Sequence, residues 1–226
     1  MSLKHIMKFT VITIFAVIAL SGCGGSKQAA ATKQTAFTDT TLTDERDGKT
    51  YRVVRIGKLA WMAENLNYIT ATTATDSSWC YDYADSNCVK YGRLYNWDTA
   101  MKACPEGWRL PTREDWNNLV KAAGGEEAGK KLKSNTGWTV LNRPTGRPTG
   151  TDDFGFSALP GGSRSCGDSG GRFFTIDKDG TWWSATETEH NASKAWFRLI
   201  ETVRNRVGEG VSPDKGYGFS VRCVRE

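Results

Sequence analysis

The chain has 226 residues, of which 38% are hydrophobic and 24% are charged. Its 30 basic and 25 acidic residues are interspersed and give a formal net charge of +5, a pattern that does not indicate nucleic-acid binding. The 24 glycines and 9 tryptophans are typical of a loop-rich domain held by aromatic packing, which argues against a helical bundle.

The N-terminus has the features of an export signal. A basic start precedes an apolar run from Phe9 to Leu20, which is too short to span a bilayer as a helix. Small residues then lead into Cys23, and this junction resembles the lipobox of bacterial lipoproteins, in which the cysteine is acylated. We predict that 1–22 is a lipoprotein signal peptide, that Cys23 carries a lipid, and that the protein is an extracytoplasmic outer-membrane lipoprotein of the cell envelope. The alternatives are an ordinary secretory signal that contains a cysteine and a buried hydrophobic helix.

The next segment predicts a tether and then the start of a domain. Residues 23–43 are mostly Gly, Ser, Ala, Thr, Gln and Lys, which do not bury enough surface to offset chain entropy. We therefore expect a flexible tether here and a globular domain over 44–226. An Asp-Gly turn at 47–48 precedes a strand at 51–56, and 59–66 is a second apolar segment.

The middle of the chain predicts a surface loop and two helices. Residues 67–90 are polar and rich in threonine, so we interpret them as a loop. Apolar residues then recur at helical spacing over 94–104 and stop at Pro105, where a helix does not continue easily. A second helix begins after Thr112, an N-cap residue followed by acids, and ends at Gly124.

The last third of the domain predicts irregular structure followed by strands. Residues 134–172 are dominated by Gly, Pro, Asp, Thr and Arg, and long loops in compact domains often carry function. Three strands are expected at 181–185, 195–200 and 217–224.

Several motifs in order resemble the Fibrobacter succinogenes major paralogous domain, which is often found in exported lipoproteins. The motifs are Asp47-Gly48-Lys49-Thr50-Tyr51, Trp61-Met62-Ala63-Glu64-Asn65-Leu66-Asn67, Tyr91-Gly92-Arg93-Leu94-Tyr95, Cys104-Pro105-Glu106-Gly107-Trp108-Arg109-Leu110-Pro111-Thr112, the run from Asp152 to Gly162, Trp182-Trp183-Ser184-Ala185-Thr186-Glu187 and Gly218-Phe219-Ser220-Val221-Arg222-Cys223-Val224-Arg225. The resemblance covers 44–226.

A more distant similarity is to the formylglycine-generating, sulfatase-modifying enzymes, whose fold is related to C-type lectins. It rests on the Trp-Arg-Leu-Pro-Thr segment at 108–112 and on the closing segment at 218–225. The resemblance implies an α+β, C-type-lectin-like fold with two helices flanking small antiparallel sheets and long irregular loops. It also implies a disulfide between Cys104 and Cys223.

Five cysteines remain beyond Cys23, and in an exported protein we expect most of them to be oxidised. We predict a Cys80–Cys88 pair beside the Cys104–Cys223 pair, with Cys166 free. No CxxC motif is present, so a zinc site is not expected.

Catalysis of the formylglycine type needs reactive cysteines late in the chain, and this sequence departs from that pattern. Cys166 and His190 form a conceivable thiolate–imidazole pair, but the sequence identifies no second base, so we expect no enzymatic activity. Asp152 and Asp153 lie in the long loop, where lectin-like domains often bind Ca²⁺, although an Asx-type turn is the simpler interpretation. We expect no other cofactor.

Trp182 and Trp183 are adjacent in a predicted strand, so their side chains point to opposite faces. Either one ring is exposed as a platform for a sugar or a partner protein, or the 134–172 loop covers it. We expect a membrane-anchored binding or adhesion module that binds polysaccharide or a surface protein through this loop, Asp152, Asp153 and the exposed ring. The alternatives are an enzyme related to the sulfatase-modifying group and a structural envelope protein.

Overall fold

The computed structural model describes residues 40–70, 77–139, 149–167 and 171–226, all within one compact unit, Thr35–Glu226. Cys23, the 1–22 segment and the tether up to residue 39 lie outside the described residues. The structure is mixed α+β and consists mostly of sheet. Within the described ranges, no helix is long and apolar enough to cross a membrane.

A four-stranded antiparallel sheet brings the two ends of the domain together. Its order is β1 (Thr40–Thr43), β2 (Thr50–Ile56), β3 (Leu59–Met62) and β12 (Val224–Arg225). Strand β2 matches the predicted strand and exposes Arg52 and Arg55 while its neighbours are buried. The expected tether ends earlier than predicted, because 40–43 pairs with 50–53 as β1.

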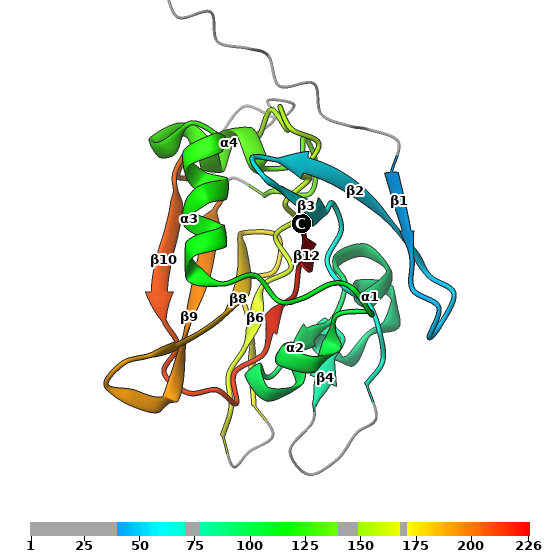
Figure 1. Ribbon diagram of the computed structural model, residues 1–226. Helices are drawn as coiled ribbons and strands as arrows, with labels where there is room; N and C mark the ends of the chain where they lie inside the picture. Colours follow the sequence, from blue (N-terminus) through cyan, green and yellow to red (C-terminus); the bar gives the residue numbers. More distant parts are fainter. Residues whose placement is uncertain (1–39, 71–76, 140–148, 168–170) are drawn as a thin grey trace, which may run out of the picture. The chain divides into compact units, whose positions relative to one another are not determined.

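A six-stranded sheet forms the centre of the domain. Its order is β10 (Val207–Val211), β9 (Asn191–Glu201), β8 (Asp179–Thr188), β11 (Phe219–Ser220), β5 (Leu94–Tyr95) and β4 (Ser78–Trp79). Only the β11–β8 pair is parallel. The segment from β11 to β12 links the two sheets, and Figure 1 shows it running through the middle of the domain.

Four α-helices and two short 3₁₀ turns complete the described structure. They are η1 (Tyr81–Tyr83), α1 (Asp85–Tyr91), α2 (Trp97–Ala103), α3 (Arg113–Ala122), η2 (Gly125–Glu127) and α4 (Ala128–Leu132). Helix α3 begins as the sequence predicts: the Thr112 side chain accepts from the Asp115 backbone N–H, and the Asp115 carboxylate accepts from the Thr112 N–H, which is a capping box. Within the described part of the irregular 134–172 region, β6 (Ser163–Arg164) pairs with β7 (Phe173–Phe174), which lies just beyond the region, and the two form a short hairpin.

Three expectations for individual segments are wrong. The segment 67–90 is not all loop, since it contains β4, η1 and most of α1. Its polar composition gave no apolar stripe from which to predict a helix, and the Cys80–Cys88 disulfide ties α1 to the turn before it. The helix predicted from Leu94 begins only at Trp97, because Leu94 and Tyr95 pair with β11 and β4, and Met101 is exposed. The strand predicted at 217–224 is two short strands in different sheets.

The core is aromatic and has two parts, one on each side of β8. Trp183 packs with α2 and with Phe219, while Trp182 packs with α3, α4 and Trp116. Both indole rings are completely buried. The expectation of one exposed ring is therefore wrong, because helices and loops cover both faces of this central strand.

One charged side chain lies inside this core. Arg222 is fully buried and donates hydrogen bonds to Asn65 Oδ1 at 2.8 Å, to the Met62 and Phe156 carbonyls, and to the Ser157 carbonyl at 2.8 Å. Burial lowers the pKa of Arg222 to about 9, so the group is still cationic at neutral pH. The guanidinium therefore joins the end of β3, the 152–157 loop and the C-terminal segment.

Candidate functional site

The two tryptophans proposed as a ligand platform have structural roles in the core. The Trp182 Nε1–H donates to Asn65 Oδ1 at 2.8 Å, and the Trp183 Nε1–H donates to the Tyr95 carbonyl at 2.6 Å. A buried indole whose N–H already has an acceptor presents neither a face nor a donor to a ligand. The polar chemistry of both rings is thus used within the fold.

Asp152 closes a turn. Its carboxylate accepts from the Ser157 backbone N–H at 2.7 Å and from the Ser157 hydroxyl at 2.6 Å, and its backbone is left-handed with φ 47°. These bonds span five residues, whereas the Asx-type turn offered as the simpler alternative reaches only two residues on, so Asp152 closes a wider loop than that alternative predicts. Asp153 is exposed nearby, and its N–H bonds the Lys131 carbonyl. Among the described residues, no group of three or more His, Cys, Asp or Glu side chains is placed to hold a metal ion.

Cys166 and His190 are held in different surroundings. Cys166 is half-buried beside Gly216 and Asp214, and burial together with the Asp214 charge raises the pKa of its thiol. His190 is exposed at the turn between β8 and β9. A raised thiol pKa is the opposite of what an activated nucleophile requires.

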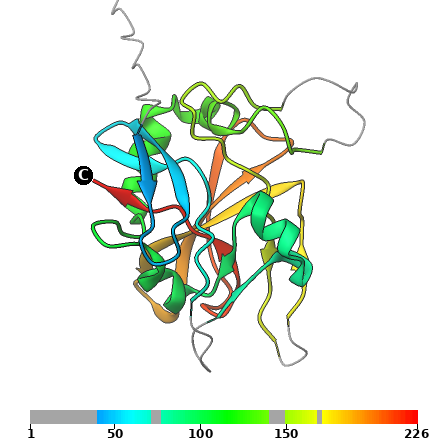
Figure 2. The ribbon, with the colours of Figure 1, turned by 90° about the vertical axis from the view of Figure 1, so that its right-hand side faces the viewer.

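The described part of the chain contains an exposed group of aromatic side chains at a different place. We call this group the aromatic patch. It lies where the η1 turn meets the β6–β7 hairpin, and Figure 2 shows the hairpin and α1 on the same side of the domain. Its members are Trp79, Tyr81, Tyr83 and Phe173.

Ring contacts join residues that are far apart in the sequence. The Phe173 ring centroid lies 5.0 Å from that of Tyr81 and 5.1 Å from that of Tyr83, and the second contact is edge-to-face. Tyr83 is 65% exposed, whereas Tyr81 is buried. Phe174 is also partly exposed, but it follows Phe173 directly in β7, so its side chain points to the opposite face of the strand. The Tyr83 ring therefore faces solvent against the packed rings of Phe173 and Tyr81, and edge-to-face contacts of this kind hold ring orientation.

Arg164 supports the patch from below. It is buried, its guanidinium stacks 4.0 Å from the Trp79 ring centroid, and its Nη2 lies 3.5 Å from the Tyr83 hydroxyl. Gly162 permits this close packing, since a Cβ there would come within 2.8 Å of the Tyr81 ring and 2.5 Å of the Phe174 carbonyl oxygen. The patch is therefore a packed surface and not a group of loose side chains.

The charged side chains around the patch include both acidic and basic residues. Asp82, Asp85 and Arg172 are exposed at its edge. Burial raises the pKa of Tyr81, so its hydroxyl stays protonated and neutral across the physiological range. The surface accordingly offers apolar ring faces with hydrogen-bonding groups beside them.

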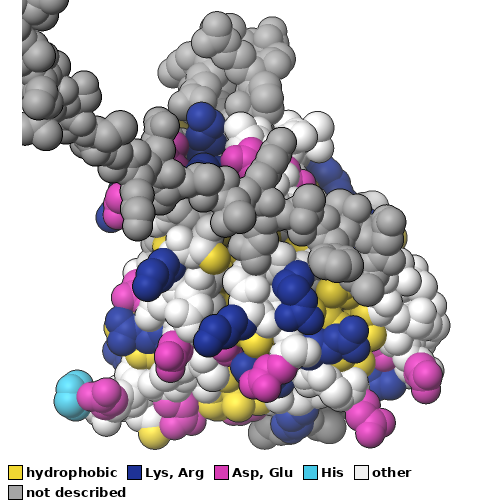
Figure 3. Space-filling model, turned by 45° about the horizontal axis from the view of Figure 1, so that its top comes forward, with side chains coloured by type: hydrophobic (Ala, Val, Ile, Leu, Met, Phe, Trp, Pro, Cys, Tyr) yellow, Lys and Arg dark blue, Asp and Glu magenta, His cyan; other side chains and the backbone are white. Residues whose placement is uncertain are grey.

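Hollows elsewhere are less suited to recognition by aromatic contacts. One of them has a volume of about 970 Å³ and lies between the β2–β3 turn and α3, beside the buried Trp61. Of its carboxylates, Asp115 is already bonded to Arg109 and Thr112. Figure 3 shows that the face seen there carries basic and acidic side chains intermingled, with small hydrophobic areas between them.

Sequence reasoning missed the patch for two reasons. Tyr81 and Tyr83 lie in the segment interpreted as a loop, and Phe173 lies just beyond the loop region 134–172 that was expected to carry binding. An exposed Tyr-Asp-Tyr turn next to a cysteine was the available signal, but only the fold places it against the hairpin.

The comparisons with known proteins establish the family. The model of the Fibrobacter succinogenes major domain matches residues 54–225. Since this match covers far more than half of the sequence, the chain belongs to that family, as its motifs indicated. No curated protein matches the chain, and no solved structure matches it.

Proposed function

We propose that this member of the Fibrobacter succinogenes major domain family is a membrane-anchored binding module that recognises polysaccharide through the aromatic patch. The observation that carries the proposal is the exposure of the Tyr83 ring against the packed rings of Phe173 and Tyr81. Aromatic side chains that are exposed and also well packed are typical binding anchors.

Sugar chemistry fits this surface better than a charged ligand does. Pyranose rings with equatorial hydroxyls, such as β-linked glucose and xylose, have apolar C–H faces that stack on aromatic rings. Their hydroxyls then point sideways, towards groups such as Asp82 and Arg172 at the edge of the patch. Because these edge charges are of both signs, the patch favours a neutral glycan over a strongly anionic one.

The fold that we propose for the domain is C-type-lectin-like. Helices α2 and α3 lie on opposite sides of β8, the 134–172 region is mostly irregular, and the Cys104–Cys223 bond joins the end of α2 to the segment before β12. Scaffolds of this kind carry recognition on loops supported by a rigid sheet.

Replacement of Tyr83 tests the proposed function. Tyr83→Ala removes the most exposed ring of the patch, so we expect binding to weaken by about 1–3 kcal/mol, or roughly 5- to 150-fold in Kd. Tyr83→Phe is the matched control, because it keeps the ring and removes only the hydroxyl, and it should bind within about twofold of wild type. Affinity electrophoresis and calorimetry of the full chain in detergent, with β-glucan, xylan and α-linked amylose, give the affinities.

Two results would count against glycan binding at this surface. One is that the wild-type protein binds none of these polysaccharides. The other is that it binds them and Tyr83→Ala binds equally well, which would place the site elsewhere. Phe173→Ala, which removes the ring that Tyr83 packs against, provides a second variant for the same comparison.

The membrane anchor is part of the same proposal. A lipid on Cys23 and a polar tether would hold the domain at the outer membrane and leave it free to reach an extended polymer. Cys23→Ala should abolish incorporation of a fatty-acid analogue and release the protein or leave an unprocessed precursor. Equal labelling of mutant and wild type would show that the lipid is not on this cysteine.

A further inference from the structure

The most exposed ring of the patch lies inside a small covalent loop. The Cys80–Cys88 disulfide has a sequence separation of 8 and encloses the η1 turn, including Tyr83. Asp82 and Tyr83 both have left-handed backbones, with φ of 52° and 57°. Residues other than glycine rarely adopt this conformation, and it persists only where the surroundings impose it.

The side chains of the turn pack against Phe173 and Arg164, but three hydrogen bonds of its backbone are local. The Tyr83 N–H donates to the Cys80 carbonyl at 3.0 Å, the Ala84 N–H donates to the Tyr81 carbonyl at 3.1 Å, and Asn87 Nδ2 donates to the same carbonyl at 2.9 Å. These bonds all lie within the loop that the disulfide closes. Opening the disulfide therefore removes the covalent closure on which the left-handed conformation depends.

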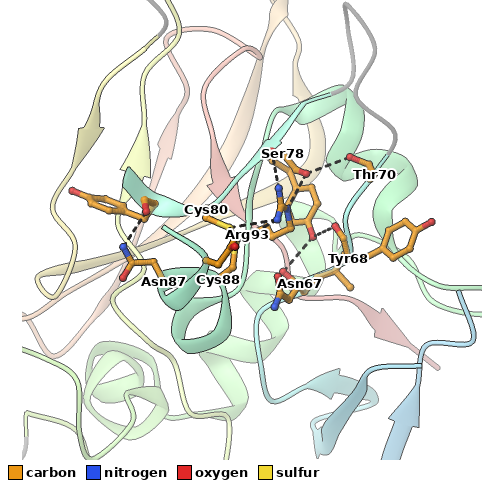
Figure 4. The surroundings of a disulfide bond; sticks show 12 residues. Asn67, Tyr68, Thr70, Ser78, Cys80, Asn87, Cys88 and Arg93 are labelled. Carbon is orange, nitrogen blue, oxygen red and sulfur yellow. Dashed lines mark hydrogen bonds between the residues drawn. A yellow bond between two sulfur atoms is a disulfide. The ribbon is translucent and has the colours of Figure 1, made fainter. Parts of the chain in front are cut away.

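Figure 4 shows that Arg93 reaches the disulfide. Its Nη1 lies 3.4 Å from Cys80 Sγ and 3.5 Å from Cys88 Sγ, and its Nε and Nη2 are held at 3.0 Å by the hydroxyl and carbonyl of Ser78. A fixed positive charge beside a sulfur favours the thiolate that departs during thiol–disulfide exchange, which accelerates the exchange. The Asp85 carboxylate lies 3.7 Å from Cys80 Sγ and opposes a thiolate there, so Cys88 is the favoured departing sulfur.

Cys80 and Cys88 are themselves buried, and Cys104 is half-buried, so the two disulfides differ less in solvent access than in the charges around them. Cys223 is completely buried in the apolar core cluster, and Cys104 packs against that cluster. Apolar surroundings disfavour a thiolate and slow attack on the bond. Its sequence separation of 119 also means that it constrains the unfolded chain far more than the short loop does. The two bonds are thus suited to different roles.

We propose that the Cys80–Cys88 disulfide is a redox latch on the aromatic patch, while Cys104–Cys223 is structural. The consequence for ligand affinity rests on the proposed function. An external dithiol attacks one Sγ of the pair, and the Sγ–Sγ bond breaks with departure of the other sulfur as a thiolate. The second thiol of the donor then resolves the mixed disulfide. Two electrons and two protons pass to Cys80 and Cys88, which become thiols, and the donor becomes a disulfide. The released turn no longer holds the Tyr83 ring against Phe173.

The order of reduction tests the latch directly. Full-length protein is treated with increasing dithiothreitol, thiols are trapped by alkylation, and peptides are assigned by mass spectrometry. We expect Cys80 and Cys88 to be alkylated at least 10-fold faster than Cys104 and Cys223. Arg93→Gln should slow the reduction of the short loop several-fold, since it removes the charge beside the sulfurs. Equal rates for the two disulfides, or reduction of Cys104–Cys223 first, would overturn the inference.

A double variant, Cys80→Ser with Cys88→Ser, separates the latch from the proposed function. In this variant, amide hydrogen exchange should accelerate at least 10-fold over residues 81–84 and stay unchanged in β8 and β9. Its affinity for whichever of β-glucan, xylan or amylose the wild-type protein binds should fall at least 10-fold. Unchanged exchange in the turn would refute the latch. If the wild-type protein binds no glycan, the proposed function fails, and the exchange comparison still decides whether the disulfide holds the turn.

Discussion

Replacement of Arg222 tests whether a buried cation organises this fold. Its guanidinium is fully buried and donates to the carbonyls of Phe156 and Ser157 and to Asn65 Oδ1. Arg222→Met keeps much of the side-chain volume and removes every donor. All four acceptors remain, because the substitution leaves Asn65 in place and the other three acceptors are the backbone carbonyls of Met62, Phe156 and Ser157.

The expected cost follows from these acceptors. A buried acceptor that loses its partner costs about 1–3 kcal/mol, which gives about 2–6 kcal/mol for the Phe156 and Ser157 carbonyls. The bond to the Met62 carbonyl is longer, at 3.3 Å, and adds little. Part of this cost is offset, because the variant no longer has to bury a charged guanidinium away from water. We therefore expect a net loss of about 2–4 kcal/mol, or roughly 5–15 °C in Tm for a domain of this size.

Denaturant unfolding of the full chain at neutral pH measures the free energy of unfolding of each variant. Arg225→Met is the matched control. Arg225 is exposed and stacks over Trp108 at 4.8 Å, so its loss should cost less than about 1 kcal/mol. Arg222→Lys keeps the charge but not the planar fork of donors and should be nearly as destabilised as the Met variant. A Met variant as stable as wild type would refute the reasoning, since it would mean that the acceptors find other donors or water.

The remaining predictions concern the core, a helix cap and the long disulfide. Trp182→Ala and Trp183→Ala should each destabilise the fold by about 3–5 kcal/mol through cavity formation, measured by denaturant unfolding, and a loss below about 1 kcal/mol in either would contradict full burial. Asp115→Ala should cost about 1 kcal/mol through loss of the capping box. Burial alone would raise the pKa of Asp115, but hydrogen bonds from Arg109 and Thr112 outweigh it and lower that pKa. The variant should therefore lose its full share of unfolding free energy above about pH 4, where the Asp115 carboxyl is ionised in the unfolded chain as well. The difference from wild type should shrink as the pH falls through the lowered pKa of Asp115 in the folded protein. A difference that persists unchanged at about pH 2 would contradict this. Replacement of Cys104 and Cys223 by alanine should cost about 5 kcal/mol by loop entropy, about twice the cost of losing the short disulfide, and equal losses would argue against that model.

Local signals in the sequence were sufficient for several parts of this protein. The alternation in 51–56 predicted β2, and Thr112 with its following acids predicted the start of α3, because strand alternation and helix capping depend on neighbours in the chain. The ordered motifs indicated the family, and the resemblance that they carry also implied the Cys104–Cys223 bond, which the structure contains. The predicted Cys80–Cys88 pair and the free Cys166 are present as well.

The tertiary structure decided where the aromatic side chains went. The sequence places Trp182 and Trp183 on opposite faces of one strand, but it does not say that α2 covers one face and α3 the other. The same holds for the aromatic patch, in which Tyr83 meets Phe173 across about ninety residues of chain. Exposure and burial depend on what packs against a side chain from elsewhere in the fold. Neither is a property of the local sequence, so only the folded chain distinguishes a core tryptophan from a binding surface.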